Sequence, residues 1–183
     1  SIKANAFAYC YNSPKNYSDY DGKKAKSEID ITQRLNDAME SHYQELQQYY
    51  KKHGLIMSVF YFINKVRTGG DWDLKNQGDW NLVKNQDYVY NGITIRSDEP
   101  GNIHFGYVGS VIFDAETLQA GAGVYQILSD TSKPEFYSSY FDDPIDSMNV
   151  MYGYLLKNGS SYSFPGYTIT IEEFEKTYRE THK

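Results

Sequence analysis

The sequence has a single cysteine and no long apolar run, and both features exclude classes of protein. Cys10 alone forms neither an internal disulfide framework nor a cysteine-rich zinc site. No apolar stretch approaches the roughly 20 residues that cross a bilayer, so we expect no membrane span. The motifs of zinc proteases, thiol redox proteins, P-loop hydrolases and serine hydrolases are also missing. We therefore predict no cofactor and no metal.

Histidine, the usual proton carrier near neutral pH, occurs only four times. His42 and His53 fall on a predicted helix and His182 lies among the terminal residues, so we interpret these three as structural. His104 is the better candidate for function, because it lies among glycine, asparagine and aromatic residues.

Aromatic residues, by contrast, make up 16% of the 183 residues, and 19 residues are tyrosine. A tyrosine has an apolar ring and a polar hydroxyl, so a chain of this kind can line a cleft or an interface with rings. The length suits one hydrophobic core. We predict a flexible N-terminal segment over residues 1–29 and a single domain over residues 30–183.

Charge is unevenly divided along the chain. The net charge is −6, from 18 basic and 24 acidic residues. Residues 1–96 carry a small positive excess, whereas residues 97–156 contain one lysine against nine acidic residues. A polyanion would therefore prefer the first half of the chain, and a basic partner or cationic ligand the second.

Helical spacing and capping signals predict a mainly helical α+β fold. Apolar residues recur at helical spacing from Asp30 to Gly54, and the more uniformly apolar residues 55–66 predict a second, largely buried helix. The Asn91-Gly92 pair between β-prone residues predicts a hairpin over residues 88–95. Further helices are predicted near residues 101–110, 116–128, 144–158 and 170–180, with a short strand at residues 167–169. Small residues along 102–110 predict a thin helix face that another backbone can approach closely.

The sharpest local cluster of reactive side chains is Gly69-Gly70-Asp71-Trp72-Asp73-Leu74-Lys75. In an extended segment, Asp73 and Lys75 project to the same side. An acid and an amine held together tune each other's pKa, and a lysine can stabilise charge on a phosphate. The alternative interpretation is a structural ion pair that holds the loop.

A second candidate is the acidic pair Asp142 and Asp143. Glycoside hydrolysis requires two separated carboxylates, and Asp73 with either of these would form such a pair if the fold joined them. The sequence Asp142-Asp143-Pro144 also has the form of a helix start, so capping is the alternative.

Four motifs in order carry a resemblance to a known family. They are Gly69–Lys75, Gly101-Asn102-Ile103-His104-Phe105-Gly106-Tyr107-Val108-Gly109, Ala120-Gly121-Ala122-Gly123 and Asp142-Asp143-Pro144-Ile145-Asp146. From about Asp30 to Tyr154, the chain resembles the bacterial polymorphic toxin domains of type 44. The resemblance implies the C-terminal toxin module of a long secreted protein, delivered into a target cell and neutralised by a cognate immunity protein.

The resemblance also implies a ribonuclease-like enzyme. The family pattern of an aspartate, a lysine and a Gly-Asn motif falls on Asp73, Lys75 and Gly101-Asn102. We therefore predict catalytic roles for Asp73, Lys75 and Asn102, with Asn102 donating a hydrogen bond to a phosphate or oxyanion. The predicted substrate-binding residues are Trp72, Gly101, His104, Tyr107, Asp142 and Asp143. His104 lies outside the family pattern, so a histidine-based mechanism is not predicted.

Three functions stay open at this point. The first is a ribonuclease toxin with tyrosines that stack on bases, although a net charge of −6 disfavours a polyanionic substrate. The second is a cell-wall hydrolase that uses Asp73 with a carboxylate of residues 142–146. The third is a binding module without catalysis. Steep salt dependence of RNA binding favours the first, and salt-tolerant activity on glycan favours the second.

Overall fold

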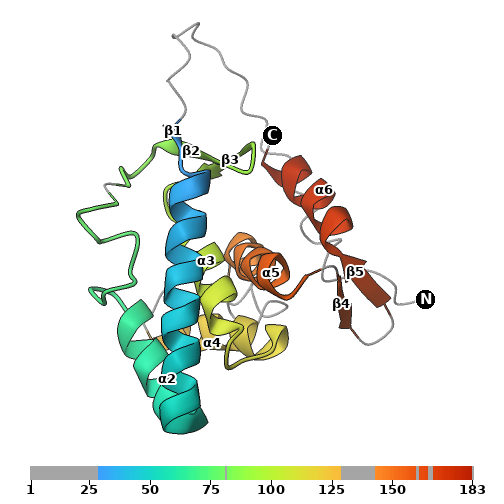
Figure 1. Cartoon of the computed structure of the whole chain (residues 1–183). Helices are drawn as coiled ribbons and strands as arrows, with labels where there is room; N and C mark the ends of the chain where they lie inside the picture. The colour runs from blue at the N-terminus through green and yellow to red at the C-terminus, as the bar shows by residue number, and fades with distance from the viewer. Residues whose placement is uncertain (1–28, 81, 129–142, 160, 165–166, 183) are drawn as a thin grey trace, which may run out of the picture.

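The computed structural model describes residues 29–80, 82–128, 143–159, 161–164 and 167–182. The described residues form a mixed, mainly helical α+β fold, as the sequence predicts (Figure 1). The helices are α2 (Thr32–Val66), α3 (Glu99–Gly109), α4 (Ala115–Leu128), α5 (Pro144–Asn158) and α6 (Ile171–Thr181). The strands are β1 (Ile29–Asp30), β2 (Asp87–Tyr90), β3 (Ile93–Arg96), β4 (Ser161–Phe164) and β5 (Tyr167–Thr170). The predicted flexible segment lies outside the described residues, except for Ile29.

Two small sheets contain the strands. The predicted hairpin is confirmed: β2 and β3 pair antiparallel, and the turn between them has positive φ at Asn91 (50°) and Gly92 (70°). β1 adds to β2 in parallel, which brings the start of α2 onto this sheet. β4 and β5 form a second antiparallel pair that leads into α6.

Helix α2 is two helices joined at a break. Gly54 has a φ of 76°, a conformation that favours glycine, and the second half folds back along the first. The rings of Tyr49 and Tyr61 stack with centroids 4.0 Å apart across this fold, which Figure 1 shows at the lower end of α2. The two predicted helices are therefore present.

The expectation that residues 55–66 are largely buried is wrong. Ile56 is 72% exposed and Phe60 is 60% exposed, and Leu55, Met57 and Ile63 are each 50% exposed. Only one face of this helical half packs, through Ser58 and Phe62, on the rest of the molecule. Because residues 55–66 are almost uniformly apolar, their sequence has no polar stripe that would show which face of the helix is exposed.

Helices α3 and α5 cross at contact distance. A Cβ atom at Gly106 would lie 1.9 Å from the carbonyl oxygen of Val150, and one at Gly153 would lie 1.9 Å from that of Ile103. The predicted thin face of residues 102–110 is thus confirmed at Gly106. This crossing holds α3, which carries several of the candidate site residues, against α5.

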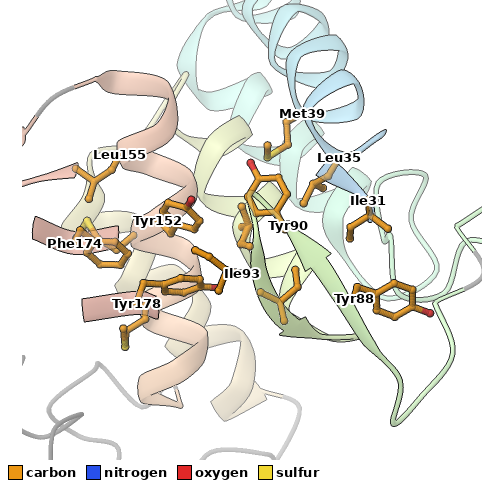
Figure 2. Packing of buried hydrophobic residues seen from close by; sticks show 14 of the residues in the cluster. Ile31, Leu35, Met39, Tyr88, Tyr90, Ile93, Tyr152, Leu155, Phe174 and Tyr178 are labelled. Carbon is orange, nitrogen blue, oxygen red and sulfur yellow. The ribbon is translucent and has the colours of Figure 1, made fainter. Parts of the chain in front are cut away.

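The main core lies between α2, the β2–β3 hairpin, α5 and α6. Figure 2 shows Tyr90, Tyr152 and Tyr178 at its centre, and all three rings are fully buried. A smaller cluster of Leu46, Phe62, Trp72 and Val108 joins the folded-back half of α2 to α3. In the described part of the chain, no helix has both the length and the apolarity that a membrane span requires.

Candidate functional site

Two imidazoles from distant parts of the chain meet between α2 and α3. The Nδ1 atom of His42 lies 2.8 Å from the Nε2 atom of His104, within hydrogen-bonding distance. The indole of Trp72 stacks on the imidazole of His42 with ring centroids 4.7 Å apart and planes inclined by 16°. Trp72 and His104 are buried, whereas the ring of His42 is half-buried.

The Trp72 loop (residues 67–80) follows α2 and carries the tryptophan to this position. The carbonyl oxygen of Lys65 accepts a hydrogen bond from the backbone N–H of Trp72, which ties the loop to the last turn of α2. A Cβ atom at Gly70 would lie 2.3 Å from the same carbonyl oxygen, so only glycine permits this close return. Local backbone geometry therefore places the Trp72 ring against the His42 ring.

Burial keeps both imidazoles neutral at pH 7. It lowers the pKa of His104 to about 3, and it also lowers the pKa of His42. The carboxylates of Glu45 and Asp71 oppose the shift at His42, whereas the ammonium of Lys65 adds to it. A neutral imidazole at a half-buried position can accept a proton, which is the property of a general base.

Lys65 is the cation whose charge acts on His42. Its Nζ atom lies 2.7 Å from Oδ2 of Asp71 and 3.4 Å from Oε1 of Glu45. The hydrogen bond from Lys65 to Asp71 raises the pKa of Lys65, so the ammonium is charged throughout the physiological pH range. The same Nζ atom lies 5.5 Å from the centre of the Trp72 ring.

The predicted Asp73–Lys75 pair has a different geometry from the one that the sequence predicts. The segment forms turns and is not extended, because the backbone N–H groups of Asn76 and Gln77 donate to the Asp73 carbonyl. The Asp73 carboxylate accepts hydrogen bonds from the Gly69 N–H and the Asn76 amide. Lys75 is exposed and has no hydrogen-bond or ion-pair partner among the described residues.

The predicted residue Asn102 is brought to the acidic group at the start of α5. Its amide Nδ2 donates to Oδ1 of Asp146 at 2.7 Å. Burial raises the pKa of Asp146 to about 7, and the carboxylates of Asp143 and Asp98 contribute to the rise. Asp143 caps α5 by accepting a hydrogen bond from the Ile145 N–H at 2.9 Å. Asp142 lies outside the described residues.

A network of contacts around the buried Glu99 lies beside this acidic group. Glu99, at the start of α3, is 1% exposed and lies 3.0 Å from Nε of Arg96 and 3.0 Å from Nε2 of His182. His182 follows α6, so this network joins the last helix to α3. The same guanidinium opposes the shift in the pKa of Asp146.

The remaining two predicted residues lie elsewhere on α3. The Tyr107 hydroxyl donates to Oε2 of Glu40 at 2.7 Å, and the Lys157 ammonium donates to the same oxygen at 2.8 Å. These bonds lower the pKa of Glu40 to about 2. Gly101 is in the first turn of α3, and a Cβ atom there would meet open space. The predicted residues on α3 therefore lie in separate groups. Asn102 contacts Asp146, whereas Asp73, among the described residues, bonds only within its own loop.

His42 is the residue that the sequence interpretation set aside. One signal was available, because His42 falls on the apolar stripe of its helix between Met39 and Leu46. Its partner lies 62 positions away, which no local pattern encodes. Among the described residues, no group of three or more His, Cys, Asp or Glu side chains is placed to hold a metal ion.

Comparison with known families shows which class of protein this chain represents, a bacterial toxin domain. Residues 61–159, more than half of the chain, match the family bacterial toxin 44, and the chain belongs to this family. The match begins in the last turns of α2, at residue 61, and includes the Trp72 loop, the β2–β3 hairpin, α3, α4 and α5. His42 lies before the matched residues. Among curated proteins and solved structures, none matches the chain.

Proposed function

We propose that this toxin domain is a ribonuclease whose active site lies where the Trp72 loop meets α2 and α3. The observation that carries the proposal is the seating of Trp72 on the His42–His104 pair. It brings a neutral imidazole, the ammonium of Lys65 and the loop that holds Lys75 into one region. Cleavage of a phosphodiester needs a base and a positive charge for the phosphate, and these groups supply both.

Lys75 is the residue best suited to bind a phosphate. It is exposed on the Trp72 loop, whereas Lys65 is already paired with Asp71. Asp73 holds the loop through Gly69 and Asn76, so its contribution is to position Lys75.

Removing the Lys75 ammonium should weaken RNA cleavage. We expect Lys75→Ala to lower kcat/KM on a labelled RNA by about tenfold, the effect of about 1.4 kcal/mol of lost phosphate binding. The loss should shrink at high salt, because salt screens the same contact. Lys84→Ala, which removes another exposed lysine, is the matched control and should cleave like the wild type. Equal rates for the two variants would refute the role of Lys75.

A second candidate function is cell-wall hydrolysis, and the geometry around Asp146 favours it. A buried carboxyl with a pKa of about 7, beside the second carboxyl of Asp143, has the properties of a general acid. The compartment of toxicity separates the two functions. A ribonuclease should arrest growth when it is made in the cytoplasm, and a cell-wall hydrolase should lyse cells only when it is exported to the periplasm.

We also propose that the domain is delivered into target cells and that its cognate immunity protein docks on the exposed apolar face of α2. This docking face consists of Leu55, Ile56, Met57, Phe60 and Ile63, each at least 50% exposed. The exposed cations Lys51, Lys52 and Arg67 flank it in the sequence. The combination fits a protein partner with an apolar centre and an acidic rim.

A charge placed in the docking face should disrupt this complex. With the immunity protein defined as the protein whose co-expression restores growth, we expect Phe60→Asp to weaken its binding at least 100-fold, a loss of about 2.7 kcal/mol. Toxicity in its absence should be unchanged, because Phe60 is not among the groups assigned to catalysis. Titration calorimetry measures the binding, with Val83→Asp, another exposed apolar position, as control. Undiminished binding by Phe60→Asp would place the partner elsewhere.

A further inference from the structure

We propose that His42 is the general base of the reaction and that His104 is the residue that positions it. This inference rests on the proposed ribonuclease function and names the group that moves the proton. Two contacts hold the ring of His42. The stacked Trp72 ring sets its plane, and the 2.8 Å contact between its Nδ1 and Nε2 of His104 sets its rotation within that plane. None of the described residues hydrogen-bonds to Nε2 of His42, so this nitrogen is the one left to meet a substrate.

The direction of the hydrogen bond between the two imidazoles follows from which ring takes a proton. His104 is fully buried and stays neutral, whereas His42 is half-buried and takes the proton first. A protonated His42 carries hydrogen on both ring nitrogens, so its Nδ1–H must donate to Nε2 of His104. The same arrangement in the neutral state leaves a lone pair on Nε2 of His42. His104 therefore does for His42 what an orienting side chain does for the histidine of a catalytic triad.

The neighbouring charges suit a base that works at neutral pH. The groups that face His42 are Glu45 on its own helix, Lys65 on the folded-back half of α2, Asp71 on the Trp72 loop and His104 on α3. The two carboxylates favour the imidazolium and the ammonium opposes it, and desolvation is the largest contribution. The pKa of His42 consequently lies below its usual 6.5, and the base is unprotonated at pH 7.

The chemical step balances with water as the only other reagent. Nε2 of His42 removes the proton from a ribose 2′-hydroxyl, and the 2′-oxygen forms a bond to the adjacent phosphorus. The bond from phosphorus to the 5′-oxygen breaks, and that oxygen takes a proton from water. The products are a 2′,3′-cyclic phosphate and a 5′-hydroxyl end, and the imidazolium of His42 returns its proton to the resulting hydroxide. The step requires a 2′-hydroxyl, so the proposal restricts the substrate to RNA.

The experiment compares two histidine variants on a defined RNA. The cleavage position is first mapped on an RNA oligonucleotide with the wild-type domain, and kcat/KM is then measured from pH 4.5 to 8.5. We expect His42→Ala to lose at least 100-fold in kcat/KM, within the roughly 10²–10⁴-fold that general-base catalysis contributes. His53→Ala, which removes a histidine from the same helical segment, should match the wild type. For the wild type, the rate should rise with pH to a plateau, with a midpoint below 6.5 because only the neutral imidazole is active.

A second series tests the positioning role and guards against a variant that does not fold. His104→Leu removes the acceptor and should lower kcat with little change in KM, whereas His104→Gln keeps an acceptor oxygen and should recover much of the rate. If His42→Ala is unfolded by circular dichroism, His42→Gln replaces it, because glutamine keeps the polar contacts but cannot act as a base at this pH. An oligonucleotide with one 2′-deoxyribose at the cleavage position should resist the wild-type domain.

The outcomes separate failure of this inference from failure of the proposed function. RNA cleavage by the wild type with equal rates for His42→Ala and His53→Ala would overturn the role of His42 and leave the ribonuclease standing. Cleavage of the 2′-deoxy substrate at the normal rate would overturn the attack by the 2′-oxygen and, with it, the proton transfer to His42. No RNA cleavage by the folded wild type would overturn the ribonuclease and this inference with it.

Discussion

Replacing Gly153 by alanine should strongly destabilise the domain. In a helix interior, the change from glycine to alanine normally stabilises by roughly 0.5–1 kcal/mol. Here the added Cβ would lie 1.9 Å from the Ile103 carbonyl oxygen and 2.8 Å from the backbone nitrogen of Tyr107. These neighbours are backbone atoms of α3, so they cannot swing aside as a side chain would. Helices α3 and α5 would have to separate, and the core on both sides would open.

We expect a loss of at least about 3 kcal/mol, the upper end for overpacked cores, from a total stability of about 5–15 kcal/mol. Urea unfolding followed by circular dichroism measures it. The matched control is Gly121→Ala on α4, where a Cβ atom would meet nothing within 4 Å. That variant should be as stable as the wild type or more stable. If Gly153→Ala unfolds at the same urea concentration as the control, the close crossing of α3 and α5 is wrong.

The elements that the sequence predicts well are those whose signals are local. The Asn91-Gly92 turn has the positive φ values that its residues favour. Asp143 caps α5, and Thr170 with Glu173 forms a capping box at the start of the predicted last helix, α6. Each signal lies within four residues of the structure that it determines, so no tertiary contact is needed to interpret it.

The candidate site could be predicted only in part, because its contacts are distant in sequence. His42 meets His104 across 62 positions, and Asn102 meets Asp146 across 44. The prediction that Asp73 and Lys75 project to the same side holds only for an extended backbone. The chain turns at Asp73, so the prediction does not apply there. The wrong prediction that residues 55–66 are largely buried has the same cause. Whether a helix face is buried depends on which distant elements pack against it.

Replacing Asp146 by asparagine should stabilise the folded domain at neutral and alkaline pH. Burial and the nearby carboxylates of Asp143 and Asp98 raise the pKa of Asp146 to about 7, from about 3.9 in an unfolded chain. The folded state therefore binds more protons between these two values, and stability falls as pH rises from about 4 to about 7. Above pH 7 the full penalty is present, and it is at most about 4 kcal/mol. Asparagine carries no charge, and its carbonyl oxygen can still accept the hydrogen bond from Asn102.

Measured by thermal unfolding, Asp146→Asn should match the wild type near pH 4 and exceed it by about 2–4 kcal/mol at pH 8. Asp114→Asn is the control, because the pKa of Asp114 is shifted in the opposite direction from that of Asp146. The Asp114 carboxylate accepts a hydrogen bond from the Thr117 N–H, which lowers its pKa, so removing this charge should not stabilise the domain at pH 8. A pH dependence for Asp146→Asn as steep as that of the wild type would show that this carboxyl is not the one that titrates.

The same variant decides whether the Asp146 carboxyl has a task in the toxin. A protein retains a carboxyl that destabilises its fold at neutral pH when that carboxyl serves function, so stability and activity should then change in opposite directions. If Asp146 is the general acid of a cell-wall hydrolase, Asp146→Asn should be more stable and should no longer lyse cells after export. If the toxin acts on RNA through His42, Asp146→Asn should be more stable and equally toxic in the cytoplasm. Loss of cytoplasmic toxicity in this stabilised variant would contradict the assignment of the reaction to the His42 site alone.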